Sequence, residues 1–208
     1  MSVRTALLLS SALLLSAPLL AAAPSDPDQR ADALIKEMTR AEKLQLVLGY
    51  FGTDMPSKNY TRVEGSVPYS AGYVPGIERL HIPAQSQTDA GVGVATQRGP
   101  HPRERTTLPS GLATAATWNP QRAFEGGAMI GDEARRSGFN VQLAGGVNLM
   151  REPRNGRNFE YGGEDPLLAG TMVGNAIKGI QSNHIVSTMK HYGFNDQETS
   201  RTRVDVKI

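Results

Sequence analysis

Charged residues recur at the carboxyl ends of successive predicted strands, and this regularity limits the possible folds more than any other feature of the sequence. Asp89 ends one predicted strand, the charged segment 151–160 follows the next, and Lys190 and His191 follow a third. In a (β/α)8 barrel, the active site lies on the face that these strand ends form. An open doubly wound sheet also binds ligands there, but at one switch point rather than at every strand. The pattern therefore favours a barrel.

The segments between these strands have the pattern of helices. Residues 110–138 are helix-rich around a Trp-Asn-Pro turn, and residues 164–183 begin with Glu-Asp-Pro, a sequence favoured at helix starts. The strands in "FNVQLAGGVNL" and "HIVSTMKHYG" are apolar without alternation, which is typical of a parallel sheet covered by helices. A complete barrel needs about 250 residues. The predicted fold class is therefore α/β, an incomplete (β/α)8 TIM-like barrel that contains only its N-terminal strands and helices.

The N-terminus has the pattern of a secretory signal peptide. Arg4 precedes an apolar run that ends in small residues near Ala22 and Ala23. We predict a signal peptide over residues 1–23 and a folded domain over residues 24–208. A transmembrane anchor is the alternative, which the proline within the apolar run and its small-residue end disfavour. The absence of cysteine suits a bacterial periplasmic or exported protein without stable membrane insertion after cleavage.

The first part of the predicted domain combines helices with an irregular segment. Two short helices are predicted around the "MTRAEK" turn, with Asp26 or Asp28 as the N-terminal cap of the first. Residues 52–83 are rich in Gly, Pro and Tyr, and we predict a long irregular loop there. Such loops in compact domains are often functional.

Composition and missing motifs exclude several classes of function. The 22 basic and 20 acidic residues are well mixed, which gives no indication of nucleic-acid binding. Without cysteine there is no disulfide, thiolate nucleophile or cysteine-ligated metal. The sequence has no H-E-x-x-H spacing, no G-x-S-x-G elbow and no P-loop or dinucleotide fingerprint. We therefore predict no metal site and no cofactor.

Each candidate site residue has a structural alternative. In "TDAGVGV", the Asp89 carboxylate suits a ligand with hydroxyl donors, or it caps a turn. The loop 151–166 holds three arginines and four acids, which either bind a ligand or form a salt-bridged surface loop. Lys190 and His191 can reach one ligand only if the strand has ended, because neighbours in a strand point to opposite faces. A histidine is otherwise more often structural.

Taken together and in order, these segments resemble glycoside hydrolase family 3, the family of bacterial and plant β-glucosidases. The resemblance runs from about Ala31 to Ile208 and is longest over "PSGLATAATWNPQRAFEGG…" to "…REPRNGRNFEYGGEDPLLAG". "TDAGVGV" stands where the family has an Asp-Gly-Pro-like loop. "KHYGFNDQETSR" is similar to the family's Lys-His-x-x-x-Asn-x-Gln-Glu-x-x-Arg run. Because no second histidine follows His191, the glucosidase or xylosidase branch fits better than the N-acetylglucosaminidase branch.

The resemblance implies retaining hydrolysis of β-linked glycosides and a role for each matching residue. It implies that the hydroxyls of the sugar next to the scissile bond are bound by four residues: Asp89, Arg157, Lys190 and His191. Three more residues would hold the Arg and Lys side chains in place: Glu160, Glu198 and Arg201. The implied partner is a small-molecule or oligosaccharide β-glycoside, and residues 195–201 would be the polar support that orients Lys190 and His191. A neutral sugar offers only hydroxyls, so charged donors and acceptors suit its recognition.

A retaining glycosidase also needs two carboxyl groups about 5 Å apart, one as nucleophile and one as acid/base. In this family the nucleophilic Asp lies in a Ser-Asp-Trp-like motif on a later strand, and the acid/base Glu usually lies in a second domain. The sequence has one tryptophan and no Ser-Asp-Trp. We therefore expect the N-terminal part of a larger enzyme, inactive by itself. A non-catalytic sugar-binding pseudo-enzyme or truncated product, and a periplasmic structural or interaction module, are the alternatives.

Overall fold

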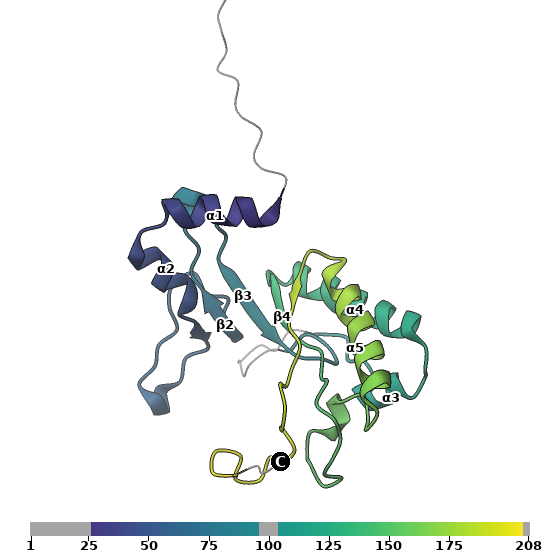
Figure 1. Cartoon of the computed structure of the whole chain (residues 1–208). Coiled ribbons are helices and arrows are strands. Elements are labelled where there is room, and N and C mark those ends of the chain that lie inside the picture. Colours follow the sequence, from purple (N-terminus) through teal and green to yellow (C-terminus); the bar gives the residue numbers. More distant parts are fainter. Residues whose placement is uncertain (1–25, 96–103, 206–208) are drawn as a thin grey trace, which may run out of the picture. The chain divides into compact units, whose positions relative to one another are not determined.

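The computed structural model describes residues 26–95 and 104–205 (Figure 1). The predicted signal peptide, residues 1–23, lies outside the described residues. The chain divides into two compact units after Met38, and each is described here by itself. Among the described helices, none combines the length and the apolar character that crossing a membrane requires.

The first unit contains one described helix, α1 (Pro27–Glu37). Asp26 is its N-terminal cap, because its side chain accepts a hydrogen bond from the backbone N–H of Asp28 at 3.2 Å. Pro27 occupies the first helical position, where its missing N–H costs nothing. Of the two caps that the sequence allowed, the structure therefore selects Asp26.

The second unit begins with helix α2 (Arg40–Val47), which a capping box starts. The Thr39 side chain accepts from the Glu42 backbone N–H, and the Glu42 carboxylate accepts from the Thr39 backbone N–H at 2.8 Å. The same carboxylate accepts from Arg79 Nη2 at 2.6 Å and from Arg79 Nε at 2.7 Å. The hydrogen bonds from Arg79 and then from the Thr39 backbone lower the pKa of Glu42 from 4.5 to about 2.

This pair predicts an acid-sensitive contact between α2 and the segment that carries Arg79. Because the pKa of Glu42 is lower in the folded chain, its stabilising contribution is present above pH 4.5 and is lost as the pH falls towards 2. In Arg79→Met we expect the pKa of the Glu42 carboxyl to rise towards 4.5 but to stay below it, because the hydrogen bonds from Thr39 remain, and NMR of the side-chain carboxyl carbon measures this pKa. Arg40→Met serves as the control, because it removes a positive charge from α2, the helix of Glu42, and leaves the pair of Glu42 and Arg79 in place. A Glu42 titration unchanged by Arg79→Met would contradict this assignment.

Five strands form one mixed sheet in the order β1-β2-β3-β4-β5. β3, β4 and β5 are parallel, as the sequence predicted, whereas β1 pairs antiparallel with β2 and β2 pairs antiparallel with β3. The sequence predicted no strands within residues 50–74, so the two antiparallel strands are additional to the predicted parallel ones. The bounds of the strands are β1 (Tyr50–Gly52), β2 (Ser70–Val74), β3 (Gln85–Asp89), β4 (Val141–Leu143) and β5 (Val186–Ser187).

The segment 52–83 is more regular than predicted. It contains β2 and two short 3₁₀ helices, η1 (Pro56–Lys58) and η2 (Glu78–Leu80). β2 pairs along β3, with Gly72 opposite Gln87. A Cβ on Gly72 would lie 2.6 Å from the Gln87 side chain, so glycine allows the close pairing. Ser-Ala-Gly-Tyr-Val has no alternating pattern, which is why the sequence did not indicate a strand.

Helices connect the parallel strands. α3 (Gly111–Ala115) and α4 (Pro120–Arg136) lie between β3 and β4, and α5 (Pro166–Gln181) lies between β4 and β5. The predicted entry turns are confirmed, because Asn119 caps α4 and Asp165 caps α5 through their side chains, each followed by proline. This is the α/β order that the sequence predicted.

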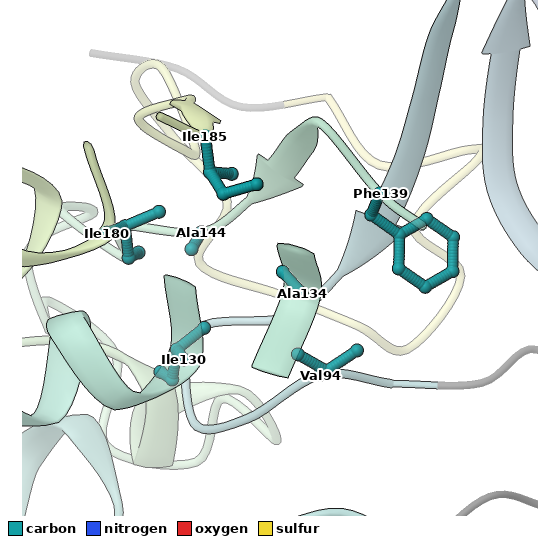
Figure 2. Packing of buried hydrophobic residues seen from close by; sticks show 7 residues of the cluster. All are labelled: Val94, Ile130, Ala134, Phe139, Ala144, Ile180 and Ile185. Carbon is teal, nitrogen blue, oxygen red and sulfur yellow. The ribbon is translucent and has the colours of Figure 1, made fainter. Parts of the chain in front are cut away.

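The main hydrophobic core lies between these helices and the parallel strands. Figure 2 shows its buried side chains, which come from α4, α5 and the segments that flank β3, β4 and β5. They are Val94, Ile130, Ala134, Phe139, Ala144, Ile180 and Ile185. The core holds the three parallel strands in register, so their carboxyl ends lie along one edge of the sheet.

Close packing of α4 against α5 depends on glycine. A Cβ on Gly127 would lie 2.0 Å from the carbonyl oxygen of Ala176, and a Cβ on Gly179 would lie 2.1 Å from that of Phe124. Both positions leave no room for a side chain between the two helix backbones. The absence of these side chains therefore sets the separation of the helices.

Candidate active site

The carboxyl ends of β3, β4 and β5 converge on one pocket of about 380 Å³. Asp89 is the last residue of β3. Lys190 lies beyond β5 but continues its parallel pairing, since its N–H donates to the Gly145 carbonyl at 2.9 Å and its carbonyl accepts from Val147 N–H at 2.8 Å. The pocket is lined by Asp89, Ala90, Gly91, Val92, Arg157, Phe159, Glu160, Lys190 and His191. All four residues to which the resemblance assigns sugar binding are among them.

Asp89 and Lys190 form the ion pair that joins the first strand end to the last. Lys190 Nζ donates to Asp89 Oδ1 at 3.3 Å, and both side chains are largely but not completely shielded from solvent. The Asp89–Ala90 and Lys190–His191 peptide bonds are both cis. Fully buried Gln142, on β4, donates to the Ala90 carbonyl at 2.7 Å and so fixes the start of the loop after Asp89.

Arg157 enters the pocket from the loop after β4, where two carboxylates hold its guanidinium. Its Nε donates to Glu160 Oε1, and the Glu160 side chain is only 6% exposed. Glu198 lies 3.8 Å from Arg157 Nη1, and Arg201 pairs with Glu198 at 3.1 Å. Burial by itself lowers the pKa of Arg157, but the hydrogen bond and charge of Glu160 outweigh it, and the pKa is raised. Arg157 is thus a fixed cation.

The three supporting residues of the sequence analysis occupy different places. Glu160 lines the pocket itself, in addition to holding Arg157. Glu198 and Arg201 are absent from the pocket lining within the described chain, and Arg201 reaches the site through Glu198. Arg201 is about half exposed.

His191 is held by a residue that the sequence analysis missed. The Tyr161 hydroxyl lies 3.0 Å from His191 Nδ1, and Asn195 Nδ2 donates to the Tyr161 hydroxyl oxygen at 2.6 Å. Tyr161 is completely buried, and its ring meets the imidazole edge to face. Its position directly after the charged "NGRNFE" segment, in a Gly-rich loop, was the available signal: an aromatic ring there needs a partner for its hydroxyl.

Burial also sets the protonation of this pair. It lowers the pKa of His191, and the positive charge of Arg157 lowers it further. Burial raises the pKa of Tyr161. At neutral pH both side chains are therefore uncharged, so His191 and Tyr161 interact as hydrogen-bonding groups rather than as an ion pair.

Two loops that carry site residues are bonded to each other. Asn148 Nδ2 donates to Asp196 Oδ1 at 2.7 Å, and its Oδ1 accepts from the Asn195 backbone N–H at 3.0 Å. Asn155 Nδ2 donates to the Asn195 carbonyl at 3.0 Å. Arg151 pairs with Asp196 at 3.6 Å. The loop after β4 and the loop after β5 therefore form one hydrogen-bonded assembly, which we call the paired loops (residues 148–163 and 193–198).

The pocket combines hydrogen-bond donors with hydrogen-bond acceptors. Within residues 26–95 and 104–205, no group of three or more His, Asp or Glu side chains is placed to hold a metal ion. Arg157 and Lys190 donate hydrogen bonds, Asp89 and Glu160 accept them, and His191 can do either. Such a set can bind several hydroxyl groups of one small ligand, each with a partner of opposite hydrogen-bonding character.

The sequence places the chain in a family of glycoside hydrolases. The sequence matches the family described as Glycosyl hydrolase family 3 N terminal domain over residues 57–204, well over half of its length. The chain belongs to this family. The resemblance drawn from the sequence motifs is therefore confirmed.

Curated relatives and solved structures support the same family. The chain is 40% identical over 142 residues to a β-glucosidase from Bacteroides ovatus and 38% identical over 132 residues to β-glucosidase A from Butyrivibrio fibrisolvens, each match covering 64% of this chain. β-Glucosidase 3B from Thermotoga neapolitana, solved in complex with glucose, superposes with a TM-score of 0.71 at 31% identity over 80% of this chain. These likenesses confirm the predicted fold class, α/β with an incomplete (β/α)8-like barrel.

The chain is short relative to these proteins. Its matches span 19% and 15% of the two curated relatives and 23% of the Thermotoga neapolitana chain. A β-glucosidase, DesR from Streptomyces venezuelae in complex with D-glucose, superposes with a TM-score of 0.67 at 30% identity, over 83% of this chain and 20% of that one.

Proposed function

We propose that this chain supplies the sugar-binding part of the active site of an enzyme that hydrolyses β-linked glycosides with retention, with a β-glucoside as substrate. The observation that carries the proposal is the pocket at the strand ends, where Asp89, Arg157, Lys190 and His191 meet around one space. Its relatives are β-glucosidases, and solved neighbours hold glucose.

The pocket chemistry supports binding of the sugar next to the scissile bond. Hydroxyls of a glucosyl ring both donate and accept, and the pocket offers charged partners of both kinds in a shielded space. Charge develops on the ring in an oxocarbenium-like transition state, and hydrogen bonds to the hydroxyls strengthen there. We propose that Asp89 accepts from a hydroxyl while Arg157, Lys190 and His191 donate to others.

Bond cleavage would need two further carboxyl groups. A retaining mechanism uses a nucleophile and an acid/base about 5 Å apart. No Ser-Asp-Trp motif, which carries the nucleophile in this family, occurs among these 208 residues. We propose that the sugar-binding residues are contributed here and that the two reacting carboxyl groups are not.

The expected result is binding without turnover. The purified 208-residue chain should bind D-glucose saturably, measured by saturation-transfer NMR and by titration calorimetry. It should release no p-nitrophenol from p-nitrophenyl β-D-glucoside above the buffer rate. Binding follows from the hydroxyl partners that line the pocket, and the lack of turnover follows from the absence of the nucleophile motif.

L-Glucose provides the matched control, since it carries the same hydroxyls in mirror-image arrangement and should not compete. Failure of D-glucose to bind, with the chain folded by circular dichroism, would overturn the proposed function. Turnover that Asp89→Ala abolishes would overturn the proposal that the reacting carboxyl groups lie elsewhere.

A further inference from the structure

His191 Nδ1 faces two hydrogen-bonding groups whose roles are fixed by their chemistry. The Tyr161 hydroxyl lies at 3.0 Å and Asn195 Nδ2 at 3.3 Å. An amide nitrogen can only donate, whereas a phenol has one proton and can also accept. Asn195 Nδ2 already donates to the Tyr161 oxygen at 2.6 Å. The Tyr161 oxygen is thus an acceptor towards Asn195, and its own proton is available for another partner.

With the Asn195 amide oriented as in the structure, all three groups are satisfied when His191 Nδ1 is unprotonated. Tyr161 then donates its proton to Nδ1, and the Asn195 amide also directs a donor at it. With a proton on Nδ1, the Nδ1–H donor would face the N–H of Asn195. The Tyr161 proton would also lose Nδ1 as its acceptor, although Tyr161 is completely buried. Buried hydroxyls without a partner are strongly disfavoured. A neutral imidazole with an unprotonated Nδ1 carries its proton on Nε2.

We propose that Tyr161 is a positioning residue that fixes His191 as the Nε2–H tautomer, so that His191 presents a hydrogen-bond donor to a sugar hydroxyl oxygen. The donor role rests on the proposed function, whereas the tautomer does not. The two ring nitrogens point in widely different directions. Because Nδ1 is turned to buried Tyr161, Nε2 is the nitrogen left for a ligand in the strand-end pocket, one of two pockets that His191 lines. His191 then acts as a fixed donor and not as a proton acceptor.

The charges around His191 support the neutral state. Burial disfavours the imidazolium most, followed by the positive charge of Arg157, and Lys190 and Arg201 add smaller effects in the same direction. Glu160 acts in the opposite direction, and Asp89 lines the same pocket from β3. Protonation would also make both ring nitrogens donors and break the contact from the Tyr161 proton.

The test is ¹⁵N NMR of the histidine rings in the full 208-residue chain, with His191→Gln to assign the signals. The wild-type chain should show His191 with a protonated Nε2 and an unprotonated Nδ1 at neutral pH. In Tyr161→Phe, Nδ1 keeps only the longer contact to Asn195, so both tautomers should be populated and the pKa of His191 should rise by about one unit. Tyr192→Phe is the matched control, because Tyr192 is adjacent in sequence but fully exposed.

Each outcome bears on one claim. A wild-type His191 with the proton on Nδ1 overturns the proposal without any variant. An unchanged tautomer and pKa in a folded Tyr161→Phe overturn the positioning role of Tyr161. Should Tyr161→Phe fail to fold, Asn195→Ala tests the same network, since Tyr161 then loses its fixed donor and both tautomers should appear. Loss of glucose binding with the Nε2–H tautomer intact would overturn the proposed function and leave this inference standing.

Discussion

Replacing Asp89 by alanine is expected to weaken D-glucose binding to the chain by about 100-fold, or about 2.7 kcal/mol. Asp89 is the carboxylate of β3 in the pocket and accepts from Lys190 at 3.3 Å. Its removal takes away a charged acceptor for a sugar hydroxyl and leaves the Lys190 ammonium, which is mostly shielded, without that carboxylate. Hydrogen bonds to charged groups are stronger than neutral ones, which is why the loss is large. Titration calorimetry of the variant measures it.

Two further variants separate charge from shape. Asp89→Asn keeps the size of the side chain and one acceptor. Its affinity for D-glucose should therefore fall by about 10-fold, less than in Asp89→Ala. Glu152→Gln removes a carboxylate from the loop after β4. This carboxylate pairs with exposed Arg154 and does not line the pocket, so binding should not change. Equal affinity of wild type and Asp89→Ala would show that the pocket is not the glucose site.

Gly127→Ala is expected to destabilise the fold by about 3 kcal/mol, a large part of the 5–15 kcal/mol typical of a domain. The new Cβ would lie 2.0 Å from the Ala176 carbonyl oxygen on α5. The obstacle is backbone, which cannot rotate aside, so α4 and α5 must separate and the core side chains Ile130 and Ile180 between them lose contact. Urea unfolding followed by circular dichroism measures the loss.

Gly174→Ala is the matched control, because it lies in the interior of α5 with nothing within 4 Å of the position of its Cβ. Alanine is preferred to glycine in helices, so this variant should be more stable by about 0.5–1 kcal/mol. Opposite signs for the two substitutions would establish that helix separation, and not helix propensity, limits residue 127. Equal effects would contradict the close-packing interpretation.

The elements that local sequence encodes were predictable. Asn119 and Asp165 precede prolines at helix starts, and their caps follow from chemistry within three residues. β2 was not predictable, because its Ser-Ala-Gly-Tyr-Val segment becomes a strand only by pairing with β3. The antiparallel pairing at the start of the sheet likewise depends on contacts between segments that are distant in sequence, and no local pattern in residues 50–74 indicates it.

The residues of the candidate site also divide into those that the sequence predicted and those that it did not. Asp89, Lys190 and His191 could be named because strand ends collect functional residues, and the structure places them in one pocket. Tyr161 was missed, because its position after the charged loop indicates only that its hydroxyl needs a partner and does not indicate which residue that partner is. Its importance appears only when the chain brings its hydroxyl within reach of His191 and of Asn195, 34 residues away in sequence.

The paired loops limit how substrate specificity could be altered by exchanging loops between homologous proteins. Asn148 and Asn155 on one loop bind Asn195 and Asp196 on the other through side-chain and backbone atoms. A graft from a homologous protein that exchanges one loop alone would separate these hydrogen-bonding partners. Residues 148–198 are therefore the smallest cassette to transplant, with α5 carried along as the spacer that keeps the two ends matched.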